Sequence, residues 1–264
     1  MRIQNVGQVI FAAVMAGLGV MSLMTGHFAP IFDGVPKALP GREALVYVCA
    51  LITLACGAGL LWKRAAAPAA RVLFAYLLVW MLLIKVRFIL LDPLTEVNYE
   101  STGETAVSVA AAWVLYALLA NDWDRQKLGL ATGDKGVRNA RVLFGLALIA
   151  FGLSHFAYLD NTASLVPGWL PWHAGWAYFT GTAYLAAGVA IIIGVYARLA
   201  TTLTAAQMGL FGLLVWLPRL GAAHFGDEIW GEFILTCTLT SGAWVVADSY
   251  RGVAWLASGK AARP

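Results

Sequence analysis

Long apolar stretches separated by short polar segments run along the whole chain. A transmembrane helix requires about 20 consecutive, mostly apolar residues, and eight stretches meet or nearly meet this length. They cover residues 7–26, 44–62, 69–91, 104–120, 139–156, 174–195, 199–218 and 229–247. Their apolar positions are continuous, whereas the strands of a membrane barrel alternate apolar and polar residues. The pattern therefore predicts an all-α integral membrane protein with eight transmembrane helices.

The composition indicates the same environment. Hydrophobic residues make up 61% of the chain and charged residues 12%, compared with roughly 45–50% and 25% in soluble domains. A domain of this size cannot hide so much apolar surface in its own core, so the lipid bilayer is the expected surrounding. The net charge is only +4, and no run of Lys and Arg interleaved with aromatic residues is present. Nucleic acid is therefore not an expected partner.

The distribution of basic residues predicts the orientation. Eight spans place both termini on one side of the membrane, and the segments on that side contain 13 of the 18 Lys and Arg residues but only 4 of the 14 acidic residues. Cytoplasmic segments hold the excess of Lys and Arg. We therefore expect a multi-pass protein of the bacterial inner (cytoplasmic) membrane with cytoplasmic N- and C-termini. The periplasmic side would then carry all four histidines, which are His27, His155, His173 and His224.

Two loops repeat the same motifs. Each contains His-Phe-Ala followed by Val-Pro-x-x-Leu-Pro, and the histidines, His27 and His155, are 128 residues apart. The two proline motifs are 131 residues apart, and so are the two Ala-Trp-Val sequences at 112–114 and 243–245. The offset of 131 thus persists over several helices, which predicts an internal repeat.

The repeat predicts how the chain is divided. Residues 1–121 and 139–264 each hold four spans, and the charged segment 122–138 between them is expected to be a cytoplasmic linker. Because four is an even number, both units start on the same side and form parallel repeats related by an axis along the membrane normal. Motifs at equivalent positions should then face each other across that axis.

Residues 141–219 carry a further pattern. A histidine ends the first helix of this segment, a proline-rich outer loop follows, and Trp176-x-Tyr178-x-x-Gly181 starts the second helix. This segment resembles the four-helix DoxX-like (DoxX/DoxD) membrane proteins, and the N-terminal half echoes it as part of a fused tandem. The resemblance implies a subunit or accessory of a quinone-linked redox system, of the quinol oxidase or thiosulfate:quinone oxidoreductase type. It also implies quinone as the ligand and a periplasmic or membrane redox partner.

Polar residues near the outer ends of the helices are the candidates for binding a ligand. Two histidines related by the repeat can flank a quinone head group and exchange protons with it. Cations at the outer ends of the third and seventh helices can snorkel or bind an anion, and acids at the starts of the fourth and eighth favour the helix dipole. The candidates are His27, His155, Lys85, Arg87, Arg219, Glu104 and Glu232.

Other sites are less favoured. A bis-histidine haem would need His27 and His155 on one iron, without support from further histidines in the helices, and we do not expect haem. No metal site and no catalytic residue is predicted. The acidic segment 91–104 is expected to be a solvated cap, with a docking patch for a basic partner as the alternative. The aromatic residues of the loop 154–172 are typical of an interfacial belt.

Three functions remain open at this point. The first is the quinone-linked redox subunit. The second is a transporter of a small anion or another small molecule, with a site between the repeats. The third is a non-catalytic membrane anchor for a periplasmic partner. Motifs for nucleotide binding, serine hydrolases or metalloproteases are absent from the sequence, so a stand-alone hydrolase or a nucleotide-driven enzyme is not supported.

Overall fold

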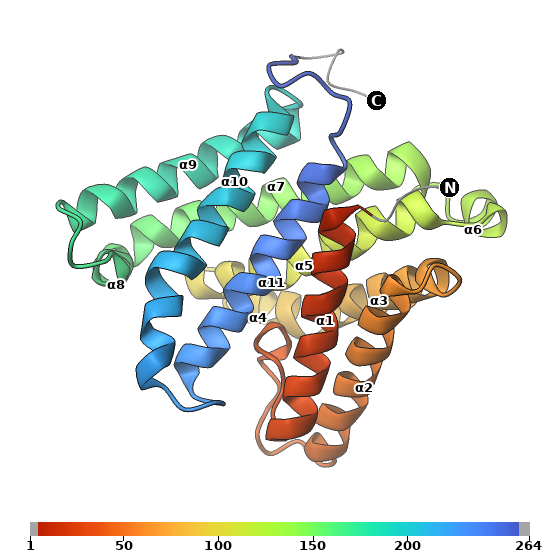
Figure 1. The fold of residues 1–264 in the computed structure, drawn as a ribbon, viewed down its shortest axis with the longest axis horizontal. Helices are drawn as coiled ribbons and strands as arrows, with labels where there is room; N and C mark the ends of the chain where they lie inside the picture. Colours follow the sequence, from red (N-terminus) through yellow and green to blue (C-terminus); the bar gives the residue numbers. More distant parts are fainter. Residues whose placement is uncertain (1–4, 259–264) are drawn as a thin grey trace.

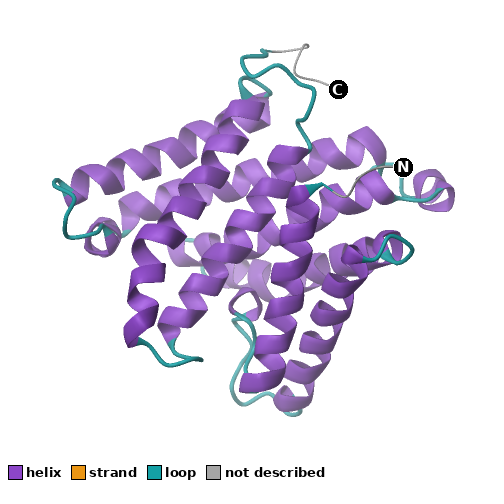
Figure 2. Ribbon diagram, in the orientation of Figure 1, coloured by secondary structure: helices purple, strands orange, loops and turns teal. Residues whose placement is uncertain are grey.

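The computed structural model describes residues 5–258, and all regular elements within this range are helical (Figures 1 and 2). The α-helices are α1 (Val6–Thr25), α2 (Arg42–Leu61), α3 (Ala66–Trp80), α4 (Val86–Leu91), α5 (Glu96–Leu119), α6 (Asp122–Lys127), α7 (Gly133–Ala157), α8 (Leu159–Leu165), α9 (His173–Ile193), α10 (Ala197–Phe211) and α11 (Glu228–Asp248). The remaining elements are the 3-10 turns η1 (Pro30–Phe32) and η4 (Leu217–Ala222) and the π-helical turns η2 (Met81–Lys85) and η3 (Gly212–Trp216).

Eight helical runs are long and apolar enough to cross a membrane. Six of them are single helices, whereas α3, η2 and α4 join into Ala66–Leu91, and α10, η3 and η4 join into Ala197–Ala222. Large apolar side chains lie exposed on these runs, including Leu83 at 66% and Leu213 at 56%. Side chains of this kind on the outside of a protein are suited to lipid. The predicted all-α membrane architecture is confirmed, and the chain is a multi-pass membrane protein.

Several helices extend beyond the predicted spans. α5 begins at Glu96, eight residues before the predicted start, so most of the acidic segment 91–104 is helix. Helix α6 and the first turn of α7 lie within the predicted linker 122–138. The physical reason is the same in both places. Hydropathy reports which residues contact lipid, whereas polar residues such as Glu also form helix readily.

The helices pack in corresponding pairs. α1 runs along α2 as α7 runs along α9, and α3 packs on α5 as α10 packs on α11. In addition, α1 packs on α11 and α5 packs on α7, so the first helix of each half contacts the last helix of the other half (Figure 1). α5 and α11 also contact each other. These two helices therefore lie between the halves, and 72% of the apolar window of α5 is buried.

Glycines permit the closest of these contacts. A Cβ atom added to Gly57 in α2 would lie 2.4 Å from the backbone nitrogen of Ala16 in α1. A Cβ atom added to Gly188 in α9 would lie 2.6 Å from the carbonyl oxygen of Gly145 in α7. Small residues let the backbones of membrane helices approach in this way. Gly57 and Gly188 are 131 residues apart, which is the offset of the repeat.

The π-helical turns show the same offset. η2 and η3 both have five residues, and each residue of η3 lies 131 positions after its counterpart in η2. Such turns are rare and interrupt the regular hydrogen-bond ladder, often at functional sites. The division into two repeats stays a prediction, and this correspondence supports it.

We call the two ends of the bundle the terminus end and the histidine end. At the terminus end, α1 begins beside the end of α11, where the backbone N–H of Gly7 donates to Asp248 at 3.1 Å (Figure 1). The histidine end carries the connecting segments 26–41, which includes η1, 92–95, 158–172, which includes α8, and 223–227.

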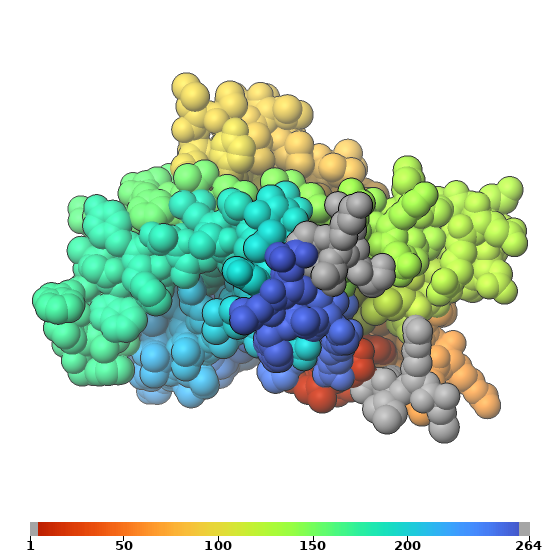
Figure 3. Space-filling view, turned by 90° about the horizontal axis from the view of Figure 1, so that it is seen from above, coloured from red at the N-terminus to blue at the C-terminus, as the bar shows by residue number. Residues whose placement is uncertain are grey.

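Two arginines fix the segment that follows α11. The guanidinium carbon of Arg141 lies 3.6 Å from the ring centre of Tyr250, and that of Arg198 lies 4.1 Å from the ring centre of Trp255. Burial raises the pKa of the Tyr250 hydroxyl, although the charge of Arg141 opposes this. Seen from the terminus end, the segment lies in the middle of the molecule, between the teal and lime-green parts of the chain (Figure 3).

Candidate functional site

A cavity of about 170 Å³ lies near the histidine end, between α5 and the helices of the second half. Its polar lining consists of Glu100, Glu104, Ser154, His155, Thr162, Tyr184, Glu232 and Thr236. Its apolar and aromatic lining consists of Phe151, Leu165, Met208, Phe211, Trp216, Leu235 and Leu239. An apolar cavity of about 150 Å³ is known to hold one benzene molecule. The cavity is therefore large enough for a single six-membered ring.

Three carboxylates converge on this cavity from two helices. Glu100 and Glu104 are four residues apart and lie on the same face of α5, while Glu232 lies in the first turns of α11. Glu104 interacts electrostatically with both of the others. Glu100 also lies near Ser154 of α7, whose hydroxyl donates to the carbonyl oxygen of Phe151 at 3.2 Å. Like charges held together at low dielectric repel one another strongly, so this group of side chains is suited to take up a proton.

His155 adds a second type of proton-exchanging group. It lies in the last turn of α7, and its Nδ1 atom is 2.7 Å from the carbonyl oxygen of Phe151. Because a carbonyl oxygen only accepts hydrogen bonds, Nδ1 carries the hydrogen and donates it. Nε2 is then the acceptor nitrogen of the neutral ring. The imidazole also packs edge-on against Tyr184, with ring centres 5.4 Å apart.

His27 lies outside this cavity. α1 ends at Thr25, and Gly26 adopts a left-handed conformation with φ of 67° that turns the chain away, so His27 follows the helix as an exposed residue. α7 continues through the equivalent position and ends at Ala157. The two histidines therefore have different surroundings. The structure does not bring them together around one ligand.

The three predicted cations do not form an anion site. Lys85 ends the π-helical turn η2 and is only 2% exposed. Its ammonium group donates to the hydroxyl of Ser101 at 2.7 Å and forms an ion pair with Asp33. It also interacts electrostatically with Glu104, so it extends the polar network of the cavity toward the first half.

The other two cations lie apart from the cavity. Arg87 is exposed on α4. The guanidinium carbon of Arg219 lies 5.2 Å from the ring centre of Trp216, which is a cation–π contact. Neither side chain lines the cavity.

Sequence reasoning missed several residues of the site. Glu100 was part of the presumed cap, although its spacing of four from Glu104 would have placed both acids on one helix face. Trp216, the last residue of η3, lines the cavity, and its counterpart in η2 is Lys85. No signal in the sequence predicts π-helical turns. Asp33, the partner of Lys85, was not singled out either.

The corresponding region of the first half is filled by its own loop. The 3-10 turn η1 folds inward, and Phe32 is 2% exposed. Its ring centre lies 5.3 Å from that of Tyr76 and 5.1 Å from that of Trp80. The hydroxyl of Thr105 donates to the carbonyl oxygen of Ile31 at 3.1 Å. In the second half, the chain after the His-Phe-Ala motif forms α8 at the edge of the cavity instead.

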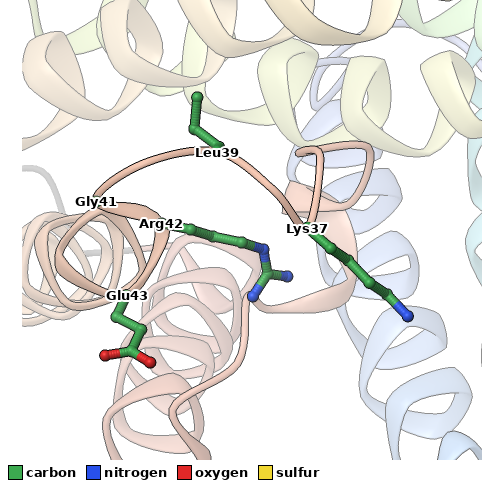
Figure 4. Close-up of a pocket in the computed structure, with 5 residues that line it drawn as sticks. All are labelled: Lys37, Leu39, Gly41, Arg42 and Glu43. Atoms are coloured by element: carbon green, nitrogen blue, oxygen red, sulfur yellow. The ribbon is translucent and has the colours of Figure 1, made fainter.

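A larger groove of about 330 Å³ lies where the loop before α2 joins that helix, beside Lys37, Leu39, Gly41, Arg42 and Glu43. The side chains of Lys37 in the loop and Arg42, the first residue of α2, extend in a similar direction, and Leu39 points the other way (Figure 4). This groove is open and is formed by residues that are close together in the sequence. It lacks the convergence of several helices that characterises ligand sites in membrane bundles, so we place the candidate site at the smaller cavity.

Within residues 5–258, no group of three or more His, Cys, Asp or Glu side chains is arranged to hold a metal ion. Comparisons of the chain with protein-family models, with curated proteins and with solved structures find no match.

Proposed function

We propose that this membrane protein binds a quinone head group in the cavity between α5 and the second half, as a subunit or accessory of a quinone-linked redox system. The observation that carries the proposal is the convergence of Glu100, Glu104, Glu232 and His155 on one ring-sized cavity with aromatic walls. A quinone changes its protonation when it is reduced or oxidised. A site that serves it needs groups that exchange protons beside a flat apolar surface.

The resemblance to DoxX-like proteins supports the same ligand. We also propose the orientation that the basic residues favour, with the histidine end at the periplasmic side of a bacterial inner membrane. The cavity would then lie at the level of the outer leaflet, within reach of a quinone dissolved in the bilayer and of a periplasmic or membrane redox partner. No residue is assigned a catalytic role.

The test is quinone binding by the purified full-length protein. Solvent extraction followed by mass spectrometry should recover quinone from protein purified in a mild detergent. Added decylubiquinone should raise the melting temperature, since a ligand that binds only the folded state stabilises it. Glu232→Gln should reduce this increase, and Glu228→Gln, an exposed acid four residues earlier, serves as the matched control. Absence of both bound quinone and stabilisation in the wild type would contradict the proposal.

Of the alternatives, transport of a small anion is opposed by the three carboxylates at the cavity and by the pairing of Lys85 with Asp33. Transport of another small molecule is favoured by the same observation that favours quinone, because buried carboxylates also serve proton-coupled transport. Substrate flux in proteoliposomes that stops in Glu104→Gln would favour it over the redox role. A pure anchor should tolerate combined replacement of His155 and Glu232 without a change in cellular phenotype.

A further inference from the structure

The first half of the molecule contains an internal occupant of the region that is hollow in the second half. Phe32 and the carbonyl group of Ile31 reach this region from the loop after α1, and both residues are almost fully buried. The aromatic ring and the carbonyl oxygen are thus presented together to α3 and α5.

The residues that hold this occupant have counterparts at the cavity. Trp80, whose ring centre is 5.1 Å from that of Phe32, corresponds at the offset of 131 to Phe211. Thr105, which donates to the carbonyl oxygen of Ile31, corresponds at the same offset to Thr236. Both counterparts line the cavity. The offset applies here because neither α5 nor α11 is interrupted between these threonines and the Ala-Trp-Val sequences that define it.

The hydroxyl of Thr236 is the second, independent observation. Thr236 is 6% exposed and lines the cavity, and its methyl group lies on the side of Gly212 in η3. Among residues 5–258, its hydroxyl makes no hydrogen bond, whereas the hydroxyls of Thr238 and Thr240 both donate to backbone carbonyls of α11. The oxygen of this hydroxyl is not one of the fully enclosed polar atoms that lack a partner, so it is accessible from the cavity. A donor that is accessible there and has no partner within the protein is positioned to donate to a ligand.

We infer that the cavity binds a planar ring that bears a carbonyl oxygen, and that Thr236 is the donor to this oxygen while Phe211 packs against the ring. The pair Thr236 and Phe211 would hold the ligand as Thr105 and Trp80 hold the Ile31 carbonyl and the Phe32 ring. This inference deepens the proposed function and rests on it for the site. It adds the residue that recognises the carbonyl group.

The test uses the full-length protein in nanodiscs and three probes, of which the second lacks the quinone chemistry of the first and the third also lacks the carbonyl group. Decylubiquinone has a ring with carbonyl groups and redox chemistry, undecanophenone has a ring with a carbonyl group alone, and decylbenzene has the ring only. The variants are Thr236→Val, which removes the hydroxyl at nearly constant volume, and Thr236→Ser, which keeps it. Thr105→Val is the matched control because it makes the same change at the equivalent, filled position.

We expect Thr236→Val to weaken binding of decylubiquinone and undecanophenone about three- to ten-fold, the range of one neutral hydrogen bond. Binding of decylbenzene should not change, and Thr236→Ser should keep the affinity of the wild type. Thr105→Val should lower the melting temperature, because it leaves the Ile31 carbonyl without its partner, but it should leave the affinity for all probes unchanged.

The outcomes separate the two proposals. If the wild type binds decylubiquinone and Thr236→Val binds it equally well, the inference is overturned and the proposed function stands. If the wild type binds undecanophenone in a manner that depends on Thr236 but does not bind the quinone, the inference stands and the quinone function is overturned. If the wild type binds none of the probes, both are overturned.

Discussion

Lys85 and Asp33 form an ion pair in which the side chain of the lysine is 2% exposed and that of the aspartate is 57% exposed. The pair joins the π-helical turn η2 to the loop that carries η1, so it also fixes the inward-folded residues Ile31 and Phe32. Replacing the partner of a buried charge lowers the free energy of unfolding much more than replacing one member of an exposed ion pair. The reason is that the remaining charge stays buried without a partner.

Asp33→Asn should therefore destabilise the protein by about 2 kcal/mol, the range for a lost hydrogen bond to a charged group. Thermal melting in detergent, followed by circular dichroism, measures this. Asp160→Asn on α8 is the control, since Asp160 is exposed and has no ion pair within residues 5–258. Equal melting temperatures for Asp33→Asn and the control would show that the ion pair does not hold the loop.

The two histidines of the repeated motif should differ in their effect on ligand binding. His155→Ala removes a side chain of the cavity and should weaken binding of decylubiquinone about ten-fold, which corresponds to a hydrogen bond of roughly 1.4 kcal/mol. His27→Ala should leave the affinity unchanged, because His27 is exposed outside the cavity. Titration of both variants with decylubiquinone in nanodiscs checks this. Equal loss in both would support the arrangement in which the histidines share one ligand.

The glycines between paired helices should tolerate no larger side chain. Gly57→Val and Gly188→Val would place atoms against the backbones of α1 and α7, and overpacking of this kind typically costs about 1–3 kcal/mol. Gly17→Val is the matched control, because nothing lies within 4 Å of a Cβ atom at that position of α1. Melting temperatures of the three variants test the prediction. A decrease for Gly17→Val as large as for the other two would point to a cost of valine itself.

The proposed orientation predicts which loops are accessible from the periplasm. A cysteine introduced at Lys37 in the loop before α2 should react with a membrane-impermeant maleimide in intact spheroplasts. A cysteine at Lys63, in the turn between α2 and α3, should react only after the membrane is permeabilised. Cys49 and Cys56 are buried and Cys237 is half-buried, so the native thiols give little background. The reverse pattern of labelling would invert the proposed orientation.

The membrane architecture follows from the sequence because burial in lipid depends on the local density of apolar side chains. All eight spans were therefore predictable, and only their polar ends were not. Glu96 and Glu100 begin α5 although no apolar window includes them. The candidates Glu104, Glu232 and His155 line the cavity. Ionisable side chains within a membrane span generally face the interior of the bundle, because contact with lipid is costly.

The difference between the halves could not be read from local patterns. Both loops contain His-Phe-Ala and Val-Pro-x-x-Leu-Pro, but one folds inward as η1 and the other forms α8. Gly26 ends α1 early with a left-handed residue, whereas the equivalent residue in α7 is Ser154, which stays helical. The ion pair between Lys85 and Asp33 depends on residues that are distant in sequence. Tertiary contacts therefore decide which half is hollow.

The matched π-helical turns have a consequence for the history of the chain. π-helical turns are rare, so two of them at the same position of the two halves would be a coincidence if the halves were unrelated. The predicted repeat would account for both, through one such turn in a four-helix precursor. The last residue of the turn is Lys85 in the first half, where it pairs with Asp33, and Trp216 in the second, where it lines the cavity.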